Sequence, residues 1–115
     1  RQYTDFINNA DEGMALVKAV GHDYFALHID LKSSFEEKES QGRLWSLYAG
    51  HIRHCHVANP GLKPPGPDCH EHGAAAAAMK AADYDRYISL EINRVSSAEE
   101  LKRTILFVKE TYLGI

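Results

Sequence analysis

Three short segments of this chain have the character of β-strands, and helix-forming segments lie between them. The expected strands are Tyr24–Asp30, His51–Val57 and Tyr87–Ile92. The first is almost continuously apolar, which is typical of a strand covered on both faces in a parallel sheet. Strands that alternate with helices predict a parallel sheet built from βαβ units. The expected fold class is therefore α/β.

The helices are predicted from apolar residues that recur at helical spacing. The expected segments are Thr4–Val20, a short helix within Lys32–Ser40, Gln41–Ala49, Ala74–Ala82 and a last helix opened by Ser97. The first would begin at Thr4 as N-cap and bury a stripe of Phe6, Ala10, Met14 and Val17. The last begins with a capping box and would bury Leu101, Ile105, Val108 and Tyr112.

The segment between the second strand and the fourth helix, Ala58–Gly73, holds all four prolines of the chain. Proline removes a backbone donor and fixes φ, so this segment is predicted to be a loop.

Composition limits the possibilities further. The chain has 115 residues, 44% of them apolar and 25% charged, which suits one compact domain over residues 1–115. A net charge of −3 gives no electrostatic case for nucleic acid or an anionic membrane surface. The sequence has no apolar run near the roughly 20 residues of a membrane span. Two cysteines make no disulfide framework, so a cytoplasmic location is expected.

Each expected strand carries an ionisable residue near its carboxyl end: Asp30, His56 and Glu91. Side chains alternate faces along a strand, and parallel strands bring these ends to one edge of the sheet. Two carboxylates and an imidazole form a mixed oxygen and nitrogen site, which suits Mn²⁺, Zn²⁺, Co²⁺ or Mg²⁺. The simpler alternatives are a carboxylate that caps the following helix and a histidine held by structural hydrogen bonds.

A second metal hypothesis uses the loop. Cys55, Cys69, His70 and His72 could form a structural zinc site. However, a regular strand would put Ile52, His54 and His56 on one face and turn Cys55 away from them, into the helix layer. The C-x₂-C pair typical of such sites is also missing. The alternative is that both cysteines are reduced bystanders and that the loop histidines are solvated.

Several stretches resemble the xylose isomerase-like TIM barrels, and within them the sugar phosphate isomerase/epimerase group. They are Thr4–Asn8, Gly21–Asp30, Ile52–Val57, Pro64–Gly66 and Tyr84–Glu91. This group includes ketose 3-epimerases and hydroxypyruvate isomerases. The resemblance covers nearly the whole chain but only the C-terminal part of the barrel, about strands 6–8 with their flanking helices.

The resemblance implies a divalent metal held by four residues, of which Asp30, His56 and Glu91 fill the last three places. The first ligand, a glutamate, would precede Arg1. It also implies that the metal stabilises an enediolate while two glutamates, one of them Glu91, remove and return a proton beside a carbonyl. The expected substrate is a small sugar or sugar phosphate.

The expected substrate-binding residues are Arg1, Ser33, His54 and Lys63. Ser33 stands where family epimerases often carry histidine, and Leu62 and Lys63 stand where an arginine is common. These departures leave the identity of the sugar open.

A complete barrel needs roughly 250 residues, so this chain is expected to be a fragment that binds metal weakly and catalyses poorly alone. The missing strands would come from the remainder of the barrel or from a second copy. The alternatives are a catalytically inactive binding or assembly module of the same fold, and a metal-dependent endonuclease-like or dehydratase-like relative.

Overall fold

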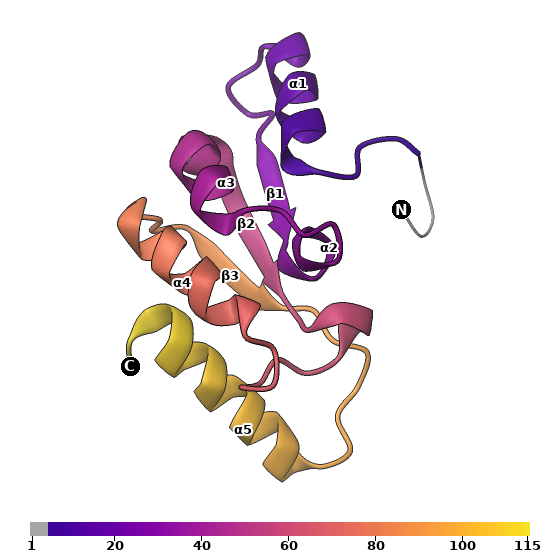
Figure 1. The fold of residues 1–115 in the computed structure, drawn as a ribbon, viewed down its shortest axis with the longest axis vertical. Coiled ribbons are helices and arrows are strands. Elements are labelled where there is room, and N and C mark those ends of the chain that lie inside the picture. Colours follow the sequence, from indigo (N-terminus) through magenta and orange to yellow (C-terminus); the bar gives the residue numbers. More distant parts are fainter. Residues whose placement is uncertain (1–4) are drawn as a thin grey trace.

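The computed structural model describes residues 5–115 and contains a three-stranded parallel sheet (Figure 1). Its strands are β1 (Leu27–Asp30), β2 (Ile52–Val57) and β3 (Tyr87–Leu90), in the order β1-β2-β3. Neighbouring strands are consecutive in the chain and are connected through helices. The expected α/β class with a parallel sheet is therefore confirmed.

Five α-helices accompany the sheet in this part of the chain: α1 (Ala10–Val20), α2 (Leu31–Glu36), α3 (Gln41–Tyr48), α4 (Glu71–Ala81) and α5 (Ala98–Val108). A 3₁₀ turn, Ala49–His51, leads into β2, and a π-helical turn, Lys109–Leu113, follows α5. Among residues 5–115, no helix is long and apolar enough to cross a membrane.

The core lies between one face of the sheet and the helices. Leu27 and Ile29 of β1 and Cys55 and Val57 of β2 are buried there, together with Trp45 of α3. In β1 these residues alternate with the more exposed His28 and Asp30, as the period of a strand requires. The predicted burial of Cys55 toward the helices is confirmed.

One prediction about β2 is wrong. Ile52 was expected to share a face with His54 and His56, but it is completely buried in the core cluster. The pairing register shifts between Leu27 and His28, so that Leu27 is opposite Ile52 while His28 is opposite His54. β2 therefore contains one extra residue, Arg53, and this bulge reverses the alternation of faces before His54.

The first helix begins later than predicted. Asn9 is the N-cap of α1, and its Oδ1 accepts a hydrogen bond from the Glu12 amide at 2.9 Å. Ile7 has a φ of 53°, which a helix cannot include. Phe6 is therefore 72% exposed instead of belonging to a buried stripe, and the expected cap Thr4 lies outside the described residues.

Strand ends differ from the expected ones as well. β1 begins at Leu27, and Tyr24 and Phe25 before it are exposed. β3 ends at Leu90, so Glu91 and Ile92 follow the strand instead of belonging to it.

The loop after β2 is shorter than predicted. It contains a 3₁₀ turn at Pro60–Leu62, and α4 starts at Glu71 instead of Ala74. This earlier start places His72 inside the helix and in the core.

The last helix has the predicted cap but a different buried face. The Ser97 hydroxyl accepts a hydrogen bond from the Glu100 amide at 3.1 Å. Thr104 is buried, and Val108 packs against the core, whereas Leu101 and Ile105 are exposed. The helix therefore meets the rest of the described chain along a narrower strip than its apolar stripe suggested.

Candidate functional site at the carboxyl edge of the sheet

The three predicted strand-end residues lie at the same edge of the sheet. Asp30 is the register partner of His56, and His56 is the partner of Ser89 in β3. Glu91 follows one residue after β3, and its amide still donates to the Val57 carbonyl at 3.2 Å. The parallel topology thus carries an aspartate, a histidine and a glutamate to the carboxyl edge.

His56 and Glu91 are in direct contact. The distance from His56 Nδ1 to Glu91 Oε2 is 3.0 Å, and the two side chains are 25% and 49% exposed. A neutral imidazole can donate its Nδ1 proton to the carboxylate in this pair, which leaves Nε2 available for another partner.

Asp30 has a structural role at the same time. Its Oδ1 accepts hydrogen bonds from the amides of Lys32 at 3.0 Å and Ser33 at 3.5 Å, which makes it the N-cap of α2. Its Oδ2 accepts from the Ser33 hydroxyl at 3.3 Å and lies 3.8 Å from Lys32 Nζ. The capping alternative considered from the sequence is therefore what this carboxylate does in the structure.

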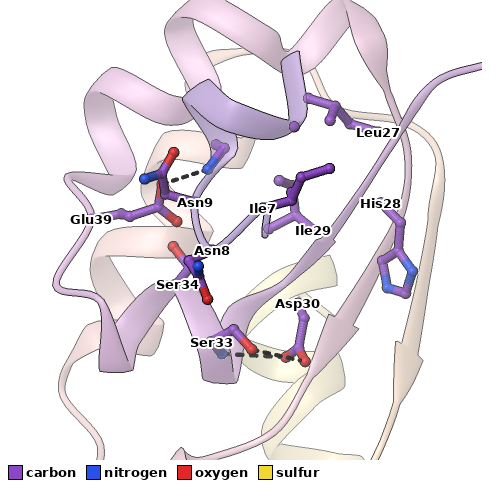
Figure 2. Close-up of a pocket in the computed structure, with 12 residues that line it drawn as sticks. Ile7, Asn8, Asn9, Leu27, His28, Ile29, Asp30, Ser33, Ser34 and Glu39 are labelled. Atoms are coloured by element: carbon purple, nitrogen blue, oxygen red, sulfur yellow. Dashed lines mark hydrogen bonds between the residues drawn. The ribbon is translucent and has the colours of Figure 1, made fainter. Parts of the chain in front are cut away.

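A pocket of about 230 Å³ lies beside β1, between the start of α2 and the segment that precedes α1 (Figure 2). Asp30 and Ser33 line it together with His28 and Asn8. The side-chain nitrogen Nδ2 of Asn8 is buried and has no hydrogen-bond partner among residues 5–115. The pocket thus combines two predicted site residues with a free amide donor.

His54 lies two residues before His56 on β2. Its Nε2 is 2.7 Å from the Ser89 hydroxyl, and its ring is half-buried. Its role in binding a substrate stays a prediction.

His28 is the residue that the sequence reasoning missed. Its ring centre lies 4.1 Å from that of His56, edge to face, and 5.2 Å from that of His54. Burial lowers the pKa of His28, and the neighbouring His56 and His54 lower it further, against the opposing charges of Asp30 and Glu91. The available signal was the alternation of β1, which puts His28 on the face of Asp30.

One predicted residue, Lys63, is not brought to this group. Lys63 is exposed, and the interaction that ties it to the fold is its backbone carbonyl, which accepts from the Asn59 amide at 2.9 Å. Arg1 lies outside the described residues.

In neither of the two predicted metal sites do the side chains come together as a set of ligands. Among residues 5–115, no three His, Cys, Asp or Glu side chains are grouped so that they could hold a metal ion. For the loop hypothesis the reason is clear, because Cys55 lies in the apolar core and His72 is hydrogen-bonded to Asn59 and Tyr112. In the strand-end set, the Asp30 carboxylate accepts from the Lys32 amide at the start of α2, whereas the Glu91 carboxylate contacts His56.

Comparison with solved structures identifies the architecture. A D-psicose 3-epimerase crystallised in the presence of D-fructose matches with a TM-score of 0.86 over 97% of this chain and 46% of its own, at 17% identity. The fold is that of part of an α/β barrel. No protein-family model matches the sequence, and no curated protein matches it.

Other epimerases have the same arrangement. An L-ribulose 3-epimerase matches with a TM-score of 0.72 and 23% identity over 90% of this chain and 35% of its own. The 3-keto-D-glucoside 4-epimerase YcjR from E. coli matches with a TM-score of 0.79 and 14% identity, over 92% of this chain and 41% of its own. The chain thus spans less than half of each of these structures.

Proposed function

We propose that this chain supplies part of the site of a divalent-metal-dependent sugar or sugar phosphate isomerase/epimerase. The observation that carries the proposal is the contact between His56 and Glu91 at the carboxyl edge of the sheet, where α/β barrels place their catalytic groups. The solved structures that share the fold are named as epimerases of sugars, which supports the same class of reaction.

The donor chemistry at this edge fits a divalent cation. Asp30, His56 and Glu91 offer carboxylate oxygens and an imidazole nitrogen, a set suited to Mn²⁺, Co²⁺, Mg²⁺ or Zn²⁺. Asp30 and His56 are register partners, and His56 already contacts Glu91. When bound, the cation would polarise the carbonyl and the adjacent hydroxyl of the substrate.

The side chains of this chain would handle the proton and the substrate. Glu91 would remove the proton from the carbon next to the carbonyl, and its hydrogen bond with His56 would hold the carboxylate in place. His54 and Ser33 offer hydrogen-bonding groups for substrate hydroxyls, and Lys63 a cation for a phosphate. Return of the proton to the opposite face requires a second base, which we assign to the rest of the barrel.

Metal binding tests the ligand assignment. Equilibrium dialysis of the purified protein with Mn²⁺ or Co²⁺ should show reduced binding for His56→Ala and for Glu91→Gln. His51→Ala is the matched control, because His51 is exposed and precedes β2. If both site variants bind as much metal as the control, the assignment of these ligands is wrong.

Isotope exchange tests the reaction. A barrel that contains this chain, incubated in deuterium oxide with a ketose such as D-fructose or D-psicose, should place deuterium on the carbon beside the carbonyl. Glu91→Gln should abolish the exchange. Conversion of the sugar without exchange would contradict proton abstraction.

A non-catalytic binding module is the second candidate. It is favoured by the structural role of Asp30, whose carboxylate caps α2 by accepting from the amides of Lys32 and Ser33. Metal binding that depends on His56, without any exchange in the intact protein, would support this module over the enzyme.

A further inference from the structure

A tight turn, Pro60–Leu62, follows the strand end that carries His56. Gly61 has a φ of 77° and Leu62 a φ of 58°, so two consecutive residues lie in the left-handed region. Glycine adopts this region freely, whereas the Cβ of leucine comes too close to a backbone oxygen. Leucine keeps such a conformation only where surrounding contacts impose it, and residues strained in this way cluster at functional sites. The proposed function gives this turn no part.

Hydrogen bonds fix the two ends of this turn. The Asn59 amide donates to the Lys63 carbonyl at 2.9 Å, which closes the turn. The Asn59 side chain is buried, and its Oδ1 accepts a hydrogen bond from His72 Nε2 of α4 at 2.7 Å. The turn is therefore anchored to the core, and the left-handed conformation of Leu62 is imposed between fixed ends.

One side of the turn holds the segment that follows Glu91. The Leu62 carbonyl accepts from the Asn93 amide at 2.9 Å, and the Gly61 carbonyl accepts from Asn93 Nδ2 at 3.4 Å. Glu91, two residues earlier, is bonded through its own amide to the Val57 carbonyl at 3.2 Å. Because Glu91 lies outside β3 and its side chain is 49% exposed, these bonds limit where its carboxylate can go.

The other side of the turn contacts α2. The Gly61 amide donates to Glu36 Oε1 at 3.2 Å, and Glu36 is the last residue of the helix that Asp30 caps. The turn thus connects the segments that carry the two carboxylates of the predicted ligand set, Asp30 and Glu91. A change in its conformation would therefore move one segment relative to the other.

We propose that Leu62 is a positioning residue for Glu91. Its left-handed backbone directs its carbonyl toward the Asn93 amide, and this bond keeps the Glu91 carboxylate at 3.0 Å from His56 Nδ1. The inference rests on the proposed function, in which Glu91 removes the proton beside the carbonyl. Displacing such a base by about 1 Å lowers the rate by up to about 10²-fold. Leu62 acts through its backbone, and its side chain need not meet the substrate.

Isotope exchange into a ketose, measured with the intact barrel, tests this role. Leu62→Gly frees the turn to adopt other conformations, so we expect kcat to fall about tenfold while KM changes by less than about twofold. Leu62→Asn should keep kcat within about twofold, because asparagine tolerates the left-handed region. Asp83→Gly is the control, since Asp83 also has a positive φ, 52°, but lies between α4 and β3 at the opposite edge of the sheet. Unchanged kcat in Leu62→Gly, or equal losses in the glycine and asparagine variants, would overturn the inference.

The ring of His56 gives a readout that does not need catalysis. At about pH 8, above the usual titration range of imidazole, nitrogen-15 NMR of the unaltered protein should show His56 protonated at Nδ1, the atom that contacts Glu91. In Leu62→Gly the signals should shift toward a mixture of the two tautomers. If this shift occurs but the unaltered protein exchanges no deuterium, the proposed reaction is wrong and the positioning of Glu91 stands. If the unaltered protein exchanges deuterium and Leu62→Gly changes neither the ring signals nor kcat, the positioning is wrong and the reaction stands.

Discussion

His72 and Asn59 are joined by a buried hydrogen bond, with His72 Nε2 at 2.7 Å from Asn59 Oδ1. The other ring nitrogen of His72 lies 2.5 Å from the Tyr112 hydroxyl. Since the amide oxygen can only accept, His72 donates from Nε2 and accepts the tyrosine proton at Nδ1. The neutral imidazole thus connects the loop after β2 to the π-helical turn that follows α5.

Replacing this histidine should destabilise the protein. His72→Phe leaves the buried Asn59 oxygen and the half-buried Tyr112 hydroxyl without their partner, at a cost of about 1–3 kcal/mol for the buried oxygen and less for the hydroxyl. Urea unfolding measures the loss. His70→Phe, at an exposed position two residues earlier, is the control and should change stability by no more than about 0.5 kcal/mol. Equal stability of the two variants would mean that the hydrogen bonds of His72 contribute nothing.

The pKa of His72 predicts how the stability of the folded protein depends on pH. Burial lowers the pKa of His72 to about 4, while the negative charges of Glu71 and Asp68 act in the opposite direction. Its pKa is thus lower in the folded than in the unfolded protein, where it is about 6.5. Between these values the unfolded chain binds the extra proton, so stability should fall as the pH drops from about 6.5 to about 4.

Unfolding curves at several pH values check this, with the His72→Phe variant as reference. The difference in stability between the two proteins should be constant above about pH 7 and should shrink as the pH falls toward 4. A difference that does not change with pH would show that His72 has an ordinary pKa in the folded state.

Period-two alternation and parallel topology explain why the sequence predicted much of the site. Asp30 and His56 were placed on the same edge from their strand positions alone, and they are register partners. Cys55 was placed in the core by the same rule, and it is completely buried. Such predictions succeed where one face of a strand is buried in the core and the other face is more exposed.

The predictions that were wrong have local causes, which the periodicity of apolar residues does not reveal. The register shift between Leu27 and His28 buries Ile52 against expectation. A left-handed φ at Ile7 and the cap at Asn9 delay the first helix. The contacts of His28 with His54 and His56 depend on how two strands pair, and this pairing is set by the whole sheet.

Asp30 offers a way to separate helix capping from metal binding. Asparagine is about as good an N-cap as aspartate, so Asp30→Asn should leave stability nearly unchanged while removing the charge. Asp30→Ala also loses the bonds to the Lys32 and Ser33 amides and should cost about 1 kcal/mol. Chemical unfolding together with Mn²⁺ dialysis distinguishes the two effects. If Asp30→Asn binds Mn²⁺ as the unaltered protein does, Asp30 is a cap and not a ligand.

A buried polar contact in α3 gives the last prediction. Gln41 accepts from the Trp45 indole at 3.2 Å through Oε1 and donates to the Ser34 hydroxyl at 2.8 Å through Nε2. Gln41→Leu would leave both partners buried and unpaired, at a cost of about 1–3 kcal/mol each. Trp45 is the single tryptophan of the sequence, so its fluorescence reports unfolding directly. Ser46→Ala, on the exposed side of the same helix, is the control, and a Gln41→Leu variant as stable as this control would show that the buried contact contributes nothing.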